Sequence, residues 1–374
     1  MASIDIIQGR VARLRELMAE RGYDAVVLRN NPDLRWLTGA TRAFDDEVAH
    51  TAFVTAEGLW LHTDSRYYNT FVERGVPELG WKMDQDVIDA PAWIAARVGE
   101  SRARVVAVES TMDLGTYDQT LVELKAAGLA ALLPRLHGEL VDMRAVKDAE
   151  ELVELRAAQR VTDEAFTHIC GFIKAGMTEQ EIRVELETYM LSHGADSLSF
   201  ETIIAAGPNG ANPHARPGSY VVKEGDFIVM DYGAGVNDYH ADMTRTVCVG
   251  QPTDEMRTVY DIVRRANEEC QELARTGAIG KDVYDHSMRV IADAGYGDYY
   301  GHGLGHGVGI EIHEEPNFNR RNTKPVPEGA VITIEPGIYL PGKFGVRIED
   351  CGLITASGYE AFGTSTHDLV CVGK

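Results

Sequence analysis

Apolar positions follow two patterns along this chain, and the patterns divide it into two parts. The first apolar stripe has helical spacing and consists of Ile7, Val11, Leu14 and Met18. It predicts an N-terminal helix that ends at Gly22. A short apolar strand follows at residues 25–28, and helical and strand-type segments then alternate. This alternation predicts a separate α/β domain over residues 1–138.

The second part of the chain contains the same order of elements twice. Asp148 with Glu151, and Thr178 with Glu181, have the spacing of capping boxes, which predicts that a helix begins at each pair. Strand-type segments follow, and the order of two helices and then strands recurs. We therefore interpret residues 139–374 as one domain built by internal duplication, in which each half contributes a hairpin to a shared site.

The first hairpin has an aspartate on each arm. Apolar runs of strand type at 227–230 and 243–249 flank a segment with the composition of a turn. If the turn is centred between residues 236 and 237, Asp231 lies opposite Asp242, with Cβ atoms about 5 Å apart. Such like charges repel, and burial increases the free-energy cost of keeping both ionised unless a cation lies between them. The alternative is that both aspartates are solvated on an exposed hairpin.

The second hairpin repeats the arrangement with glutamates. Residues 331–335 and 344–349 are its predicted strands, and a turn centred on Gly342 places Glu335 opposite Glu349. Solvation does not explain two hairpins that each oppose two acids. The four carboxylates carry four negative charges, which two divalent cations would balance.

A glycine-rich segment between the hairpins contains three histidines. Its glycines occupy every second position from 301 to 309, which argues against a helix. An extended chain keeps His302 and His306 on one face, and glycine on the other face lets neighbouring backbone approach. His313 needs a bend to reach the same place. Three histidines beside a predicted acidic site favour a functional role over a structural one, whereas the spacing around His214 favours neither.

Composition limits the classes of partner. The 374 residues, 44% of them apolar, are enough for one large or two ordinary domains. The charge is 36 − 58 = −22, so nucleic acid and anionic membranes are poor partners. We expect no membrane span and no signal peptide, because no apolar run is long enough. Five cysteines without CxxC spacing predict reduced thiols and a cytoplasmic location.

Five motifs, taken in order, resemble the metal-ligand motifs of the M24 metallopeptidases. They are Asp231-Tyr232-Gly233-Ala234, Asp242-Met243-Thr244-Arg245-Thr246, Gly305-His306-Gly307-Val308-Gly309, Glu335-Pro336-Gly337 and Arg347-Ile348-Glu349-Asp350. The N-terminal domain resembles the creatinase-type domain that simple methionine aminopeptidases lack. The combination is similar to the Xaa-Pro peptidases, prolidase and aminopeptidase P. It implies an α/β (α+β) fold with a duplicated pita-bread catalytic domain at 139–374 and a smaller N-terminal domain at 1–138.

The resemblance also implies the site and its chemistry. The implied metal ligands are Asp231, Asp242, His306, Glu335 and Glu349. They would hold two divalent cations per chain; Mn²⁺ or Co²⁺ suits this oxygen-rich set best, and Zn²⁺ or Fe²⁺ is compatible. Glu335 would also accept a proton, and the substrate-binding and transition-state histidines would be His214, His302 and His313. The implied reaction is hydrolysis of the N-terminal Xaa-Pro bond of dipeptides or short peptides through a metal-bridging hydroxide, by a homodimer.

Three other functions are alternatives to this one. A hydrolase of another C–N bond, such as an ectoine-type or other small amide, would keep the ligands and change the pocket. A non-enzymatic binding module on this fold would be expected to lack ligands, and creatinase resembles the fold but lacks them. Two positions depart from the family pattern, namely His240 and Cys351. Neither is an implied ligand.

Overall fold

The computed structural model of the chain describes residues 3–373, which form two compact units that divide between Arg144 and Ala145. The division expected from the sequence follows residue 138. All five cysteines are free thiols, as the absence of paired spacing predicts. Of the helices in the described part of the chain, none combines the length and the apolar character that a membrane crossing requires.

The N-terminal unit is a mixed sheet flanked by helices. Its elements are α1 (Ile4–Arg21), β1 (Ala25–Leu28), α2 (Asn31–Thr38), β2 (Thr51–Thr55), β3 (Leu59–His62), α3 (Tyr68–Glu73), η1 (Pro77–Leu79), β4 (Trp81–Asp84), α4 (Ala90–Ser101), β5 (Val106–Val108), α5 (Leu114–Ala126) and α6 (Glu139–Ala145). The strand order is β4-β3-β2-β1-β5. The predicted first helix is confirmed, with its apolar stripe buried and Gly22 in the left-handed conformation at its end.

The first half of the second unit begins with two long helices. Its elements are α7 (Ala149–Phe172), α8 (Glu179–Ser192), β6 (Ser197–Leu198), β7 (Ile203–Ala206), η2 (Gly207–Ala211), β8 (Phe227–Tyr232), β9 (Ala234–Val236), β10 (Tyr239–His240) and β11 (Met243–Val249). Both predicted capping boxes are present, because Asp148 and Thr178 each accept from the backbone N–H of a glutamate that bonds back to them.

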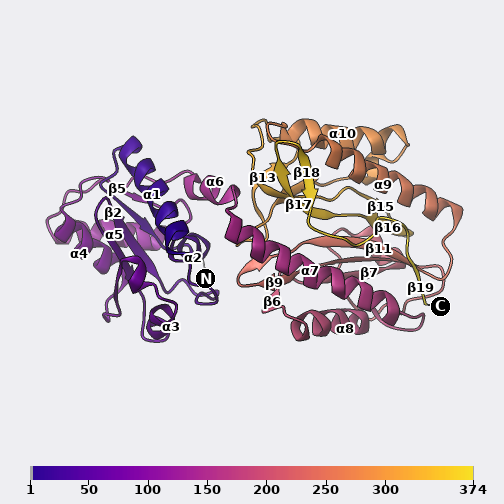
Figure 1. Cartoon of the computed structure of the whole chain (residues 1–374), viewed down its shortest axis with the longest axis horizontal. Helices are drawn as coiled ribbons and strands as arrows, with labels where there is room; N and C mark the ends of the chain where they lie inside the picture. The colour runs from indigo at the N-terminus through magenta and orange to yellow at the C-terminus, as the bar shows by residue number, and fades with distance from the viewer. Residues whose placement is uncertain (1–2, 374) are drawn as a thin grey trace. The chain divides into compact units, whose positions relative to one another are not determined.

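The second half repeats the two helices and adds more strands. Its elements are α9 (Asp254–Leu273), α10 (Gly280–Asp293), η3 (Gly297–Tyr299), β12 (Gly305–Gly307), β13 (Glu314–Phe318), β14 (Val331–Ile334), β15 (Gly337–Leu340), β16 (Phe344–Arg347), β17 (Asp350–Thr355), β18 (Gly358–Ala361) and β19 (Cys371–Val372). Within this unit the strands lie between α7 and α8 on one side and α9 and α10 on the other (Figure 1). Alternate side chains of β8 and β11 point to opposite faces, so that Ile228 and Val247 lie in one apolar core and Phe227 and Cys248 lie in another.

The aspartate hairpin is present, but its register differs from the predicted one. β8 pairs with β11, and Asp231 lies opposite Thr244 instead of Asp242. The turn residues are Asn237 and Asp238, both with positive φ, so the turn lies one residue later than predicted. Asn and Asp tolerate this backbone conformation better than other non-glycine residues. Moving the turn by one residue shifts every partner by two, so Asp231 and Asp242 remain on one face as diagonal neighbours.

The glutamate hairpin has the predicted register. β15 pairs with β16 so that Gly337 lies opposite Arg347, and β14 pairs with β17 so that Ile334 lies opposite Asp350. Glu335 and Glu349 are therefore opposite each other in the short gap between the two ladders. One detail was wrong: the first arm of the hairpin is β15, whereas the predicted arm β14 pairs with β17.

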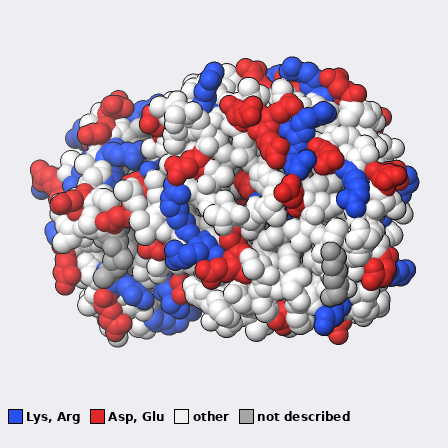
Figure 2. Space-filling model, turned by 45° about the vertical axis from the view of Figure 1, so that its right-hand side comes forward, with Lys and Arg blue, Asp and Glu red and all other residues white. Residues whose placement is uncertain are grey.

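Acidic and basic side chains are mixed on one face of the protein (Figure 2). On the face that Figure 2 shows, Asp and Glu side chains lie among Lys and Arg side chains and do not form one continuous acidic field. On this face the described residues form no single charged patch, and the distribution fits a solvated acidic surface.

Candidate metal centre

Local backbone constraints bring the acidic strands together. Between Asp231 and Asp242 the chain passes through Gly233, where an added Cβ would lie 1.8 Å from the carbonyl oxygen of Ala241. Only glycine allows this approach. The two strand ends therefore close on each other, and both aspartates line one cavity of roughly 580 Å³ together with Glu335 and Glu349.

The glycines around His306 have a similar effect. An added Cβ on Gly305 would lie 1.8 Å from the carbonyl oxygen of Thr333, so β12 approaches β14 more closely than any side chain allows. The backbone N–H of His306 donates to Thr333 Oγ1 at 3.0 Å. Its Nδ1 atom donates to the carbonyl oxygen of Gly307 at 3.0 Å, which leaves the lone pair of Nε2 facing the carboxylates.

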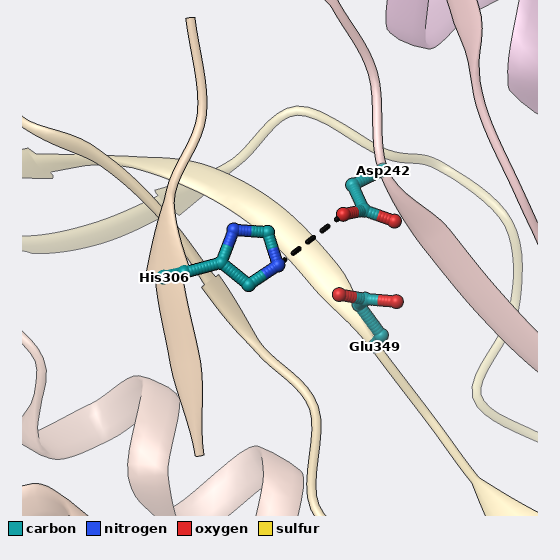
Figure 3. A group of neighbouring side chains, drawn as sticks. All are labelled: Asp242, His306 and Glu349. Atoms are coloured by element: carbon teal, nitrogen blue, oxygen red, sulfur yellow. Dashed lines mark ion pairs between the residues drawn. The ribbon is translucent and has the colours of Figure 1, made fainter. Parts of the chain in front are cut away.

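Three of the predicted ligands form a close group. Ligand atoms of Asp242, His306 and Glu349 lie within 4.8 Å of one another. Figure 3 shows the imidazole ring pointing toward the two carboxylates. His306 Nε2 lies 3.5 Å from Asp242 Oδ2 and 3.6 Å from Glu335 Oε1. An imidazole nitrogen and carboxylate oxygens at this spacing are a donor set for divalent transition metals.

The electrostatics of the group fit a cation. Burial raises the pKa of Asp242 and of Glu349 well above the usual range, and repulsion from neighbouring acids adds to the shift. Burial likewise raises the pKa of Glu335 to about 8. Within the described residues, the Oδ1 atom of Asp231 is buried without a hydrogen-bond partner. Divalent cations would compensate the buried negative charge and occupy this oxygen.

Arg347 connects two of the acidic residues through hydrogen bonds, a role that its place in the fifth motif did not predict. Its Nη2 atom donates to Asp231 Oδ2 at 2.5 Å, and its Nε atom donates to Thr244 Oγ1 at 3.0 Å. The Thr244 hydroxyl in turn donates to Glu349 Oε2 at 2.7 Å. The available signal was its position two residues before Glu349, which places both side chains on one side of the strand.

The three remaining histidines line the same cavity but differ in hydrogen bonding and in exposure. His302 has both ring nitrogens bonded: Nδ1 donates to the Gly303 carbonyl oxygen at 2.7 Å, and Nε2 accepts from Tyr339 Oη at 2.9 Å. Burial lowers the pKa of His302 to about 4, so the ring is neutral. His313 and His214 are exposed to the cavity. The His313 ring lies 4.4 Å from that of His306.

The two unusual positions noted in the sequence lie outside this cavity. The residues that line it include neither His240 nor Cys351. His240 is half-buried in β10, and its backbone N–H donates to the Gly309 carbonyl oxygen. Cys351 is buried opposite Thr333 in the β14–β17 ladder.

Family comparisons agree with this arrangement. The family model described as Metallopeptidase family M24 matches residues 153–356. The chain belongs to metallopeptidase family M24. A second model, described as Creatinase/Prolidase N-terminal domain, matches residues 10–146. Together these matches confirm the predicted family and its N-terminal domain.

Relatives of this M24 chain match it over nearly its whole length. It is 31% identical over 372 residues to Xaa-Pro dipeptidase from Pyrococcus horikoshii, which covers 98% of this chain and 100% of the relative. Its structure is similar to that of Xaa-Pro dipeptidase from Bacillus anthracis, with a TM-score of 0.90, 32% identity and coverage of 98% and 100%. X-Pro aminopeptidase from Thermotoga maritima has a TM-score of 0.87, 34% identity and coverage of 97% and 99%. These matches confirm the predicted fold class.

The buried acids are expected to make the stability of the metal-free protein depend on pH. Glu335 has a pKa of about 8 in the folded chain, against about 4.3 in an unfolded chain. Between these values the native state binds more protons than the unfolded state, so the free energy of unfolding falls as pH rises. The pKa values of His302 and His306 are lowered to about 4. These two residues therefore make the free energy of unfolding rise with pH, but only below about pH 6.5.

We therefore expect EDTA-treated protein to have a lower Tm at about pH 8.5 than at about pH 6.5. Thermal denaturation followed by circular dichroism would measure it. Glu335→Gln should weaken the dependence, and Mn²⁺ should restore the Tm at the higher pH, because metal binding requires deprotonated ligands. A metal-free protein with equal Tm at both pH values would contradict the expected repulsion.

Proposed function

We propose that this chain is a metal-dependent Xaa-Pro peptidase that hydrolyses the bond between an N-terminal residue and a following proline. The observation that carries the proposal is the convergence of four carboxylates and His306 Nε2 on one cavity. Relatives and structural neighbours named Xaa-Pro dipeptidase and X-Pro aminopeptidase support the choice of bond. The proposed substrate is a dipeptide or short peptide with proline at its second position.

The proposed ligands of two divalent cations are Asp231, Asp242, His306, Glu335 and Glu349. Two cations bound there would acidify a water molecule and polarise the scissile carbonyl. Mn²⁺ or Co²⁺ suits the donor set, and Zn²⁺ or Fe²⁺ is compatible with it. The buried, unpartnered oxygen of Asp231 supports this assignment. So does the bond from Arg347, which fixes the other oxygen of the same carboxylate.

The proposed proton acceptor is the carboxylate of Glu335, which lines the cavity beside His306. A departing proline nitrogen carries no hydrogen in the peptide bond and requires a proton to leave. His313 and His214 are the proposed N–H donors to the substrate, because in the described part of the chain their ring nitrogens have no hydrogen-bond partner. His302 has its nitrogens occupied, and we propose that it shapes the cavity wall and orients Tyr339.

The proposal predicts a strong preference for proline after the scissile bond. Protein loaded with Mn²⁺ should cleave Ala-Pro or Ala-Pro-Ala much faster than Ala-Ala. A pocket fitted to the ring gains about 0.8 kcal/mol for each additional CH₂ that it buries. N-acetyl-Ala-Pro should be poor, because a free α-amino group is attracted to the acidic centre. HPLC of each peptide against time would measure the rates.

Comparing Ala-Pro with Ala-Pro-Ala would separate dipeptide from longer-peptide preference. Equal rates on Ala-Pro and Ala-Ala would contradict the proposed substrate. No cleavage of any peptide by protein that contains metal would favour the alternative hydrolase of small amides. Elemental analysis of the same sample shows whether the site is loaded, so the two failures can be told apart.

A further inference from the structure

One loop of the catalytic unit carries a cluster of cavity residues and has little regular structure of its own. Residues 207–218 begin with the short helix η2 and continue as irregular chain. Pro213, His214, Ala215 and Arg216 from this loop line the cavity. A loop of this kind holds its side chains accurately only if other residues fix its backbone.

Glu179 makes bonds to both ends of this loop. It is the first residue of α8, and it is fully buried at 0% exposure. Its Oε1 atom accepts from the backbone N–H of Ala206 at 2.8 Å and from Asn209 Nδ2 at 3.0 Å. Its Oε2 atom accepts from the backbone N–H of Gly218 at 3.0 Å. One side chain therefore ties the start of the loop to its end.

The character of the three donors explains why this residue is a carboxylate. Two are backbone N–H groups and one is a neutral amide N–H group. Both oxygens of the side chain must therefore accept hydrogen bonds. A glutamine offers only one acceptor oxygen, and its NH₂ group would face one of these N–H donors. The N-terminal end of α8 also favours a negative charge at this position.

The opposite side of the loop rests on the strand that carries Arg347. An added Cβ on Gly345 would lie 1.8 Å from the carbonyl oxygen of Gly210, so the backbones of η2 and β16 are in direct contact. Arg347 Nη1 donates to the carbonyl oxygen of Pro213 at 3.2 Å. The loop thus lies between the Glu179 anchor and the residue that contacts Asp231.

We propose that Glu179 is a positioning residue for the reaction: it acts through the loop at 207–218 to hold His214 against the bound substrate. The proposal rests on the proposed function, because it assigns His214 to the substrate. Nothing in the sequence motifs indicated it, since Glu179 lies 35 residues before His214 in the chain. Displacing a positioned group by about 1 Å reduces turnover on the order of 10²-fold.

The first test measures the loop itself, without substrate. Glu179→Gln keeps the shape of the side chain but replaces an acceptor by a donor opposite one backbone N–H. Hydrogen exchange followed by mass spectrometry should show faster exchange of peptides within 207–218 and unchanged exchange in β8. Glu181→Gln is the matched control, because Glu181 lies in the same turn of α8, is exposed, and bonds only within its capping box. Unchanged exchange of the loop in Glu179→Gln would overturn the proposal.

The second test measures action through His214. Glu179→Gln should lower kcat/KM on Ala-Pro by on the order of 10²-fold at unchanged metal content, whereas Glu181→Gln should not. In a His214→Ala background, adding Glu179→Gln should lower kcat/KM little further, because the histidine that Glu179 positions is already absent. Additive losses would overturn the proposed action through His214.

If Glu179→Gln does not fold, Asn209→Ala removes one of the three donors and permits the same two measurements. Unchanged loop exchange in that variant would then overturn the anchor. Failure of the wild-type protein to cleave Ala-Pro would remove the proposed function instead. The exchange experiment would still decide whether Glu179 holds the loop.

Discussion

Asp242→Ala is expected to lose bound metal and to abolish peptide hydrolysis. Asp242 is the predicted ligand that lies nearest His306 Nε2 and also belongs to the close group with Glu349. Its removal would take a charged oxygen donor from the proposed metal site, and the remaining ligands would not replace it. After dialysis against Mn²⁺, the wild-type chain should contain about two ions, and the variant should contain distinctly fewer by elemental analysis.

Asp368→Ala is a suitable control for this variant. The Asp368 side chain is 83% exposed and pairs with Arg264 at the surface, so its loss should change neither ion content nor rate. An Asp242→Ala protein with wild-type ion content would remove that residue from the ligand set. A wild-type chain that stayed active after complete removal of metal would contradict the metal centre as a whole.

His313→Ala is expected to keep the metal and to lose rate. We propose this ring as an N–H donor to the substrate, and loss of one donor to a developing oxyanion typically lowers kcat by roughly 10²–10³-fold. His302→Ala should also keep the metal, with a smaller loss of rate because both of its ring nitrogens are already bonded to the protein. Steady-state kinetics on Ala-Pro, with metal content measured on the same samples, would test both variants.

The metal content is essential to this comparison, because the His313 ring lies against the ring of His306. If ion content fell in proportion to activity in His313→Ala, the residue would be a ligand or a support for one. A full ion content with wild-type kcat would remove His313 from the reaction. Only retained metal with reduced kcat agrees with the proposed role.

The strand register could be predicted from the sequence for one hairpin and not for the other. The glutamate hairpin was predicted in register because Gly342, with its positive φ, marks the turn unambiguously. In the aspartate hairpin several residues had turn character, and the turn formed one position later, at Asn237 and Asp238. The error did not separate the two aspartates. A register shift of two residues leaves each side chain on the same face of the sheet.

The supporting residues could not be predicted in the same way. The role of Arg347 depends on contacts with Asp231 and Thr244, which precede it by more than a hundred residues. Glu179 had the appearance of an ordinary acidic residue in the first turn of a helix, although it bonds to a loop near the cavity. Such roles arise when distant segments meet, and no local spacing in a single sequence records them.

The contact between β12 and β14 has a consequence for how this protein tolerates substitution. Gly305 bears no functional group, yet a single methyl group there would meet the carbonyl oxygen of Thr333 at 1.8 Å and displace the strand that carries His306. A change that adds no charge and removes no donor would then move an imidazole away from the carboxylates. A substitution at Gly305 is therefore expected to disturb the proposed metal site through backbone contact alone.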